Sequence, residues 1–343
     1  MPEIDLPPLM PAYAVQRALH RNALPAHRFK TRQRNHFAVC VVLPTLLMLL
    51  VPLALPSPLP NGWLSLEAIG LWAVMWFLVG GVGVSVGLHR HFSHRAFAAR
   101  PFLRGVMAAF GCMAGQGTVC YWVALHRSHH THSDQPGDSH SPIPSAHGLS
   151  SRWAAFVQGH IGWVWRHDVP SPTRYAADLI RDPLIVRVDR LYNWIVLSGI
   201  ALPGFVGVAI WGGWSGFLVG AYWGGIVRIA VGHHIIWAIN SVCHFAGHRP
   251  HETGDRSANV WWLGVLSFGE SWHNNHHQAP TSASFKHHWW QLDIGWTSIQ
   301  LAGRLGWASN IKEHEAQSSC ENQQPVLSPE ATKAFDVVNL TCE

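Results

Sequence analysis

Four apolar runs in the sequence are long enough to cross a lipid bilayer as helices. Glu67 and Arg228 are their only residues of the types Asp, Glu, Lys and Arg, and the runs cover residues 37–55, 64–87, 194–211 and 217–239. About 20 helical residues cross the roughly 30 Å of hydrocarbon in a membrane, and a helix satisfies its own backbone hydrogen bonds there. We therefore predict an all-α integral membrane protein with four transmembrane helices.

The distribution of positive charge predicts which side of the membrane the connections face. Six Lys and Arg residues lie in the segment 1–36, ahead of the first apolar run, whereas the connectors 56–63 and 212–216 contain none. Positive residues accumulate on cytoplasmic segments of membrane proteins. We therefore expect a multi-pass protein in which the basic segment 1–36, the long loops and both termini are cytoplasmic.

Composition argues against several other classes of protein. Hydrophobic residues make up 48% of the chain and charged residues 13%, which favours lipid as the surroundings. The net charge of +5 comes from residues that flank the apolar runs, so the sequence does not predict nucleic-acid binding. The six cysteines have no CxxC spacing and predict neither a disulfide framework nor a zinc ribbon. The segment 311–343 is polar and is predicted to be a mobile tail behind a domain spanning 37–310.

Histidine is the residue type that points to chemistry in this chain. There are 25 His, and nine of them lie in three short motifs, HRHFSH, HRSHH and HNNHH, each just beyond an apolar segment. Eight of the nine form the pattern, which leaves out His91. A repeated spacing at membrane borders argues against chance runs and against solvated surface histidines. The eight residues are His89, His94, His126, His129, His130, His273, His276 and His277.

The spacing of these motifs suits metal binding. In HxxHH three imidazoles lie on one side of a helix, because residues three and four apart are neighbours there. Two such motifs can enclose a pair of metal ions. His89 and His94 are five residues apart, about 140° around an α-helix, so we expect the helix to fray between them if both bind one ion.

The number of imidazoles and the topology restrict the kind of site. Eight imidazoles exceed what one ion accepts, imidazole suits iron, and a catalytic zinc with three protein ligands fits less well. One shared site also requires an even number of membrane crossings between any two motifs. The apolar segment 102–119 lies between the first two motifs, so we expect an interfacial or re-entrant helix there. The predicted fold is four spans with a cytoplasmic, histidine-rich helical cap that holds two metals.

At these residues the chain resembles the membrane fatty-acid desaturase family. The resemblance is to its Δ9-type branch, which includes stearoyl-CoA desaturases and bacterial and cyanobacterial acyl-lipid enzymes. It covers about 82–277 and is carried by GLHRHFSHRAF, by WVALHRSHHTHSDQPGDSHSP with its trailing aspartates, by GESWHNNHH, and by NSVCH, which is similar to the family's Asn-x-x-x-His pair. The resemblance implies an oxidoreductase that uses two iron ions, O2 and two external electrons to introduce a cis double bond into a fatty-acyl chain.

The resemblance also implies which residues would bind each iron. Asn240 would hold a water on the second iron, and it lies four residues before His244, on the same helical face. Neither residue is singled out by the three motifs. The first iron would be bound by His89, His94, His126, His130 and His276, and the second by His129, His244, His273 and His277.

Further residues are candidates for supporting roles. Glu270, Asn274 and Asn275 flank the third motif and could orient imidazoles, a role that ligating histidines require. Trp122 is a candidate for the wall of an acyl tunnel, with ordinary packing as the alternative. On the second span, Phe77 and Gly81 lie twelve and eight residues before His89, and we expect them near the methyl end of the acyl chain.

The sequence restricts the choice of acyl carrier and of electron donor. Stearoyl-CoA desaturases have Arg and Asp immediately before the second motif, where this chain has Ala124 and Leu125. This difference favours an acyl chain on a lipid or on acyl-carrier protein over one on CoA. The chain has no His-Pro-Gly-Gly element, so we expect a separate donor such as ferredoxin or a cytochrome b5-like protein.

Two other functions are compatible with parts of the pattern. A relative with the same iron site could hydroxylate the chain or convert a double bond into an alkyne, because these outcomes differ by small shifts of the substrate. A histidine-rich metal transporter is an alternative from a different class. It predicts paired ionisable groups across the middle of several spans, and the scarcity of acidic residues in the four runs argues against it.

Overall fold

A computed structural model describes residues 33–58, 63–167 and 169–313. Most of the predicted basic segment 1–36 and of the predicted tail 311–343 lies outside these residues. Within the described residues the chain is mostly helical, as predicted. The sheet in the described residues is one short antiparallel pair, β1 (Ala98–Ala99) with β2 (Ala308–Ser309), in which Ala98 lies opposite Ser309.

In the described part of the chain, four helices are long and apolar enough to cross a membrane. The second and fourth continue about two turns beyond the predicted ends, because their last turns carry histidines into the protein interior. The four helices are Gln33–Ala54, with η1 (Ala38–Val42) and α3 (Leu43–Ala54); Leu66–Ser93, with α4 (Leu66–Trp76) and η2 (Phe77–Ser93); α12 (Tyr192–Trp211); and Gly213–Phe245, with α13 (Gly213–Gly220), η4 (Ala221–Val227) and α14 (Arg228–Phe245).

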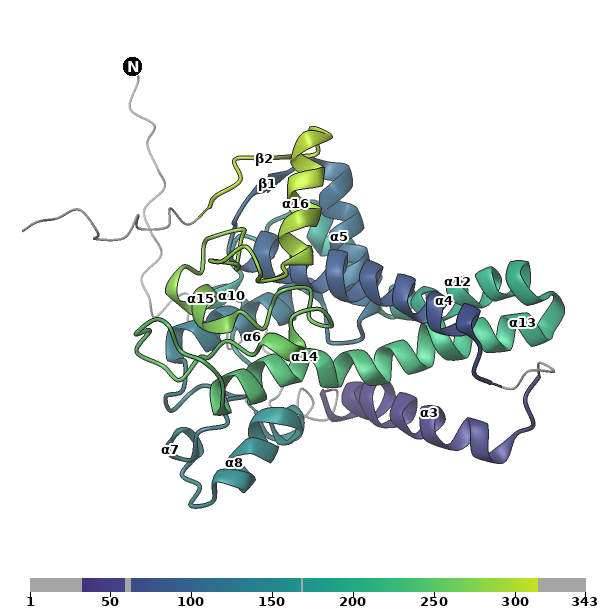
Figure 1. Cartoon of the computed structure of the whole chain (residues 1–343), viewed down its shortest axis with the longest axis horizontal. Helices are drawn as coiled ribbons and strands as arrows, with labels where there is room; N and C mark the ends of the chain where they lie inside the picture. Colours follow the sequence, from purple (N-terminus) through teal and green to yellow (C-terminus); the bar gives the residue numbers. More distant parts are fainter. Residues whose placement is uncertain (1–32, 59–62, 168, 314–343) are drawn as a thin grey trace, which may run out of the picture.

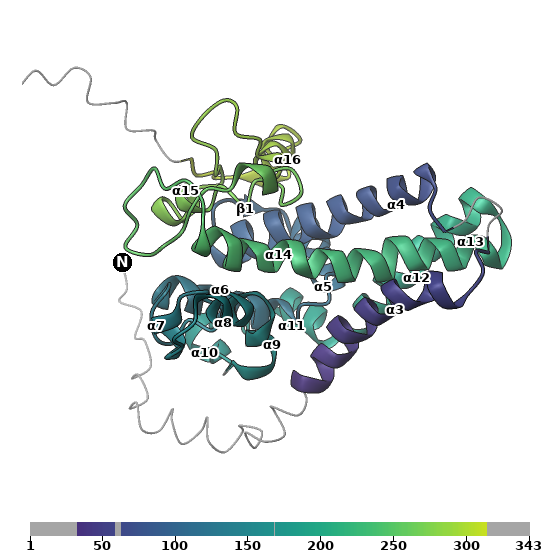
Figure 2. The ribbon, with the colours of Figure 1, turned by 60° about the horizontal axis from the view of Figure 1, so that its bottom comes forward.

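The shorter elements gather mainly at one end of the long helices. In Figure 1 the long helices run roughly horizontally, and α6, α7, α8, α10 and α15 lie at the left end. Figure 2 shows α14 passing between α6 and α15. The shorter elements are α5 (Pro101–Met113), α6 (Val119–His132), α7 (Pro144–His147), α8 (Arg152–Val157), η3 (Gln158–Gly162), α9 (Trp163–Arg166), α10 (Pro172–Tyr175), α11 (Pro183–Arg190), η5 (Trp261–Leu263), α15 (His273–Gln278) and α16 (Ile294–Arg304).

The segment that was expected to form one interfacial helix over 102–119 is divided. Helix α5 ends at Met113, and the chain turns through Gly115 and Gly117, whose φ angles are 72° and 109°. Thr118 then caps α6 by accepting a hydrogen bond from the N–H of Tyr121. The 13 residues of α5 extend over only about 20 Å, too short to cross the hydrocarbon of a bilayer.

One buried core joins the helices that carry the first two histidine motifs. Leu88 of η2, Met107 of α5 and Val123 of α6 are fully buried in it. A Cβ on Gly83 would lie 2.4 Å from the carbonyl carbon of Phe110, so η2 and α5 touch through their backbones. This packing fixes η2 relative to α6, which starts two residues after Gly117.

Glycines also bring the third and fourth long helices together. A Cβ on Gly207 of α12 would lie 2.1 Å from the carbonyl oxygen of Gly216 in α13. Small residues allow such close approach, which is a common basis of helix association in lipid. The tight α12–α13 pair directs α14 back toward the end of the molecule where the histidines gather.

Arg228 is buried at the start of α14, within the fourth long helix. Its guanidinium donates to the carbonyl oxygens of Gly224 at 2.8 Å, Met113 at 2.9 Å and Gly199 at 3.1 Å. These acceptors belong to η4, to the last turn of α5 and to α12. Arg228 therefore links α5 to two of the long helices, and its location in the protein interior agrees with the general behaviour of ionisable groups within spans.

Candidate metal centre

The backbone of η2 brings the two histidines of the first motif together. His94 is the residue that follows η2, and its N–H donates to the carbonyl oxygen of His89 at 3.1 Å. Hydrogen bonds between residues five apart are the π-helical pattern, which stacks residues i and i+5. The fraying that we expected between His89 and His94 therefore does not occur. The winding of the helix changes instead, and the two ring centroids lie 4.9 Å apart.

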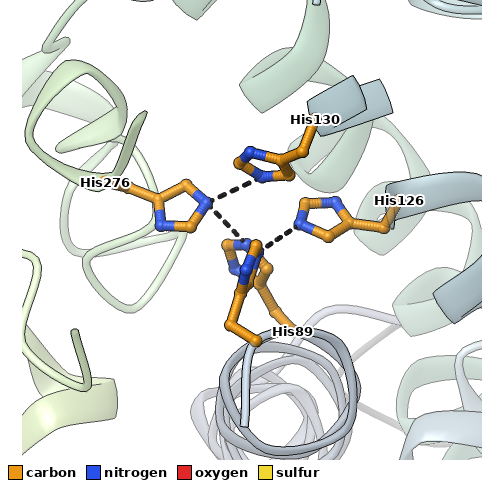
Figure 3. Close-up of side chains that lie close together, drawn as sticks. His89, His126, His130 and His276 are labelled. Atoms are coloured by element: carbon orange, nitrogen blue, oxygen red, sulfur yellow. Dashed lines mark hydrogen bonds between the residues drawn. The ribbon is translucent and has the colours of Figure 1, made fainter. Parts of the chain in front are cut away.

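Five imidazoles from three segments form the first group. The Nε2 atoms of His94 and His126 lie 2.7 Å apart, and Nε2 of His276 lies 3.1 Å from that of His89 and 3.0 Å from that of His130. Figure 3 shows the labelled rings turned toward a common point. One ring nitrogen from each of the five histidines lies within 4.8 Å of the others. These five residues are the set that the family resemblance implies for the first iron.

Four further imidazoles form the second group beside the first. Nε2 of His273 lies 3.0 Å from that of His244 and 3.1 Å from that of His277. His129 completes the group, with one ring nitrogen from each residue within 4.8 Å of the others. Nε2 of His129 is buried and has no hydrogen-bond partner. A buried polar atom left unpaired is costly, so this orphaned nitrogen fits the position of a metal ligand.

Carboxylates hold the outer nitrogen of four of these imidazoles. Nδ1 of His129 lies 2.9 Å from Asp138, Nδ1 of His244 lies 2.9 Å from Asp134, and Nδ1 of His277 lies 2.5 Å from Asp255. Nδ1 of His89 contacts Glu270, which also accepts from Ser85 and pairs with Arg90. Each contact places the proton on Nδ1 and leaves the Nε2 lone pair directed inward. This carboxylate–imidazole arrangement is typical of ligating histidines.

The electrostatic surroundings keep most of the ligand set neutral. Burial, together with the neighbouring imidazoles, lowers the pKa of these histidines well below its ordinary value, and they are His94, His126, His130, His273 and His276. For His129, burial is outweighed by the carboxylate of Asp138, which raises the pKa of the imidazole. Neutral imidazole is the form that binds metal. The donor set therefore fits two metal ions held mainly by histidine nitrogen.

The supporting residues differ partly from the sequence-based interpretation. Glu270 contacts a ligand imidazole, whereas Asn274 and Asn275 bond to other groups in the described structure. The Asn274 amide donates to the carbonyl oxygen of His251 at 3.0 Å, and the Asn275 amide donates to that of Phe285 at 2.9 Å. Both amides are fully buried and tie neighbouring loops to α15. Their role is to position the helix rather than the rings.

Sequence reasoning did not assign Asp134, Asp138 and Asp255 to the site. Asp134 and Asp138 follow the second motif within the segment that carries the family resemblance, so that segment contained a signal for them. Asp255 lies in the irregular segment between α14 and η5, and no spacing in the sequence links it to His277. His140 is also buried, with its Nδ1 3.4 Å from the Asp138 carboxylate.

A mainly apolar cavity meets the two groups. His89, His126 and His273 line it, and Asn240 lies on its wall one turn before His244. Trp122 also lines it, where its indole N–H donates to the Gln116 side chain at 3.0 Å. A cavity of this kind beside a metal site suits an acyl chain.

Two residues of the second long helix that line the cavity each lie one position before an expected one. Trp76 and Gly80 line the cavity, whereas Phe77 and Gly81 contact Phe268, which itself lines it. The rings of Phe77 and Phe268 are 6.0 Å apart, and a Cβ on Gly81 would lie 3.3 Å from the Phe268 ring. Phe77 and Gly81 therefore lie one layer behind the cavity wall.

Four long apolar helices, together with two groups of converging imidazoles, define a helical protein whose histidine groups fit a metal site. The family model for fatty acid desaturase matches residues 70–300, which include every histidine of both groups. The chain therefore belongs to the fatty acid desaturase family and is an oxidoreductase that acts as a fatty-acyl desaturase.

Three relatives illustrate the range of the family. The chain is 41% identical over 286 residues to a hex-5-enoyl-[acyl-carrier protein] acetylenase of Moorena producens, covering 82% of this chain and 87% of the relative. It is 37% identical to an sn-1 stearoyl-lipid 9-desaturase of Anabaena variabilis, over 72% of this chain and 85% of the relative. An sn-1 stearoyl-lipid 9-desaturase of Synechocystis is 36% identical, over 76% of each chain.

Proposed function

We propose that this protein is a multi-pass membrane enzyme that uses O2 to introduce a cis double bond, at a Δ9-type position, into a fatty-acyl chain at a histidine-bound diiron centre. The observation that carries the proposal is the division of nine imidazoles into two adjacent groups, with the buried Nε2 of His129 in the second left without a hydrogen-bond partner. Two groups accommodate two ions, and imidazole suits iron. The active site and the termini are cytoplasmic in this proposal, in accord with the positive charge of the segment 1–36.

In this proposal, residues of the chain bind the two irons and orient the acyl chain. The five-histidine group would hold one iron and the four-histidine group the other, with Asn240 holding a water near the second. When bound, the irons would supply the oxidising power that removes hydrogen from an unactivated methylene, which no side chain can do. Asp134, Asp138, Asp255 and Glu270 hold the protons on Nδ1, and the apolar cavity positions the acyl chain and excludes water from it.

The acyl carrier in this proposal is a lipid or acyl-carrier protein. Ala124 and Leu125, where stearoyl-CoA desaturases have Arg and Asp, are both buried and apolar, so they offer no charge to a CoA phosphate. The two stearoyl-lipid desaturases and the acyl-carrier-protein acetylenase named above represent the two carriers. The two electrons would come from a separate donor such as ferredoxin or a cytochrome b5-like protein.

Alkyne formation on an acyl-carrier-protein-linked chain is the second candidate function. The 41% identity to the Moorena acetylenase over 82% of this chain favours it. The same iron site serves both outcomes, because the difference is whether a single or a double bond lies beside the metals. The geometry of the described residues is compatible with both double-bond formation and alkyne formation.

Iron content and product analysis together test the proposal. We expect close to two irons per chain in protein purified with iron supplied, and new alkenes in lipid-linked or carrier-linked acyl chains of an expressing host. Products are identified by mass spectrometry after derivatisation that locates the unsaturated bond. Alkynes would establish the second candidate. One zinc per chain with no dependence of activity on iron would contradict both.

A further inference from the structure

A second cavity reaches the two histidine groups and shares no lining residue with the apolar cavity. Three of its lining residues are the candidate ligands His94, His130 and His277. Most of the other lining residues are polar, among them Ser133, Thr253 and Asp255. The metal centre is therefore approached by one apolar cavity and by one polar cavity.

The candidate ligands that remain partly exposed to solvent are those that line the polar cavity. Among the nine candidate ligands, the six that do not line it are buried, whereas His94, His130 and His277 keep partial exposure. At the rim, the side chains of Thr131 and Gln135 are exposed. Solvent therefore meets the ligand set through the same three residues that line this cavity.

The two cavities also differ in volume and in what they can hold. The polar cavity measures about 430 Å³ and the apolar cavity about 70 Å³. On this measure one water needs roughly 10–15 Å³ and two or more polar partners. The polar cavity has room for many waters, and its wall supplies hydroxyl, carboxylate and imidazole groups. The apolar cavity is narrow and would be filled by the acyl chain during turnover.

The balanced reaction requires a route for water and protons. Removal of two hydrogens from an acyl chain by O2, with two electrons from a one-electron carrier protein and two protons from solvent, yields one alkene and two waters. The protons must reach the metal centre and the waters must leave it. An acyl chain in the apolar cavity blocks that path and offers no hydrogen-bond partner to water.

We propose that the polar cavity is the route by which protons and water pass between solvent and the metal centre, an inference that rests on the proposed desaturase function. Ser133 donates to Asp255 at 3.0 Å, and Thr253 donates to the same carboxylate at 2.7 Å, so polar groups continue from the ligands to the rim. Arg127 borders the cavity but is held by Asp178 at 2.7 Å and by the carbonyl oxygen of Phe92 at 2.7 Å. It therefore stays at the wall.

The test is a reversible block of the rim at Gln135. In the full-length, iron-loaded protein, Gln135→Cys is treated with a bulky hydrophilic methanethiosulfonate and then restored with dithiothreitol. The matched control is Glu252→Cys, whose position is exposed but does not line the cavity. Wild-type protein treated in the same way measures any effect of modifying the six native cysteines.

Two quantities are measured before and after the block. We expect both the rate of azide binding, followed by absorbance, and the turnover to fall roughly tenfold, with iron content and KM for the acyl substrate unchanged and with recovery after reduction. Equal azide binding and turnover in fully modified Gln135→Cys and Glu252→Cys would overturn the route. Slowed azide binding in a protein that makes no unsaturated product would support the route and refute the proposed function.

Discussion

Asp134 accepts a hydrogen bond from Nδ1 of His244 at 2.9 Å, although 110 residues separate the two in the chain. The same carboxylate accepts from the backbone N–H of Arg256 at 2.7 Å and from the hydroxyl of Ser141. One side chain thus joins the segment after α6, the end of α14 and the segment that follows α14. The second imidazole group depends on this junction, because His244 lies at the end of α14 and His129 lies in α6, just before the segment that carries Asp134.

We expect Asp134→Asn to weaken metal binding by the second group. The amide is similar in shape but lacks the charge that holds the proton on Nδ1 of His244, and loss of such partners lowers metal affinity about 10–100-fold. Metal retained after graded dialysis against a chelator measures the effect. Asp182→Asn is the control, because Asp182 caps α11 and pairs with Arg104. Equal retention in both variants would show that Asp134 has no role in binding.

The two groups predict which histidines are essential. His129→Ala and His244→Ala should each abolish turnover while the protein stays in the membrane, because each removes one ligand from a four-histidine group and no apolar span. His91→Ala should stay active, since Nδ1 of His91 bonds to the carbonyl oxygen of Phe97 at 3.0 Å and the residue belongs to neither group. Turnover and membrane content are measured together. Loss of activity in His91→Ala would mean that the first group is assigned wrongly.

Trp76 should limit the length of acyl chain that the cavity accepts. Its ring fills the space beside Gly80 and Gly232. A Cβ added at either glycine would lie 2.7 Å from the Trp76 ring. Trp76→Ala should shift the products toward longer chains, and Gly81→Phe should shift them toward shorter ones by pressing on Phe268. Chain-length profiles of the products check both.

The profile of Phe77→Ala separates the two layers of this wall. Phe77 lies behind Phe268, so its removal should change chain length less than Trp76→Ala. Truncating a buried Trp also costs about 3–5 kcal/mol of stability, so expression is compared first. A larger shift in Phe77→Ala than in Trp76→Ala would place the end of the acyl chain on the other face of the second long helix.

The metal-free protein should lose stability in mild acid. Burial lowers the pKa of His277 to about 4 and that of His140 to about 3, against an ordinary value of 6.5. Between about pH 4 and 6.5 the unfolded chain therefore binds more protons than the folded one, and the free energy of unfolding falls as the pH falls. Each such group contributes up to about 1.4 kcal/mol per pH unit. Thermal unfolding in detergent after metal removal measures the slope, and a flat profile would contradict these pKa values.

Much of the architecture was determined by the sequence, because it follows from local patterns. Apolar runs of about 20 residues define helices wherever lipid is the solvent, and four of the described helices match the predicted runs. The spacing in HRSHH and HNNHH sets which imidazoles share a helical face. The family resemblance added His244 and Asn240, and the structure brings His244 into the second group.

The tertiary structure decided the features that depend on contacts between distant segments. The carboxylate of Asp255 reaches His277 through an irregular segment that has no periodicity, so sequence spacing carries no information about the pair. The π-helical winding that stacks His89 and His94 belongs to η2, which packs closely against α5. On the same long helix, Trp76 rather than Phe77 lies on the cavity wall. Hydropathy and motif spacing describe each helix separately. The rotation of one helix against another, and the cavities between them, arise only when side chains from all of them compete for the same space.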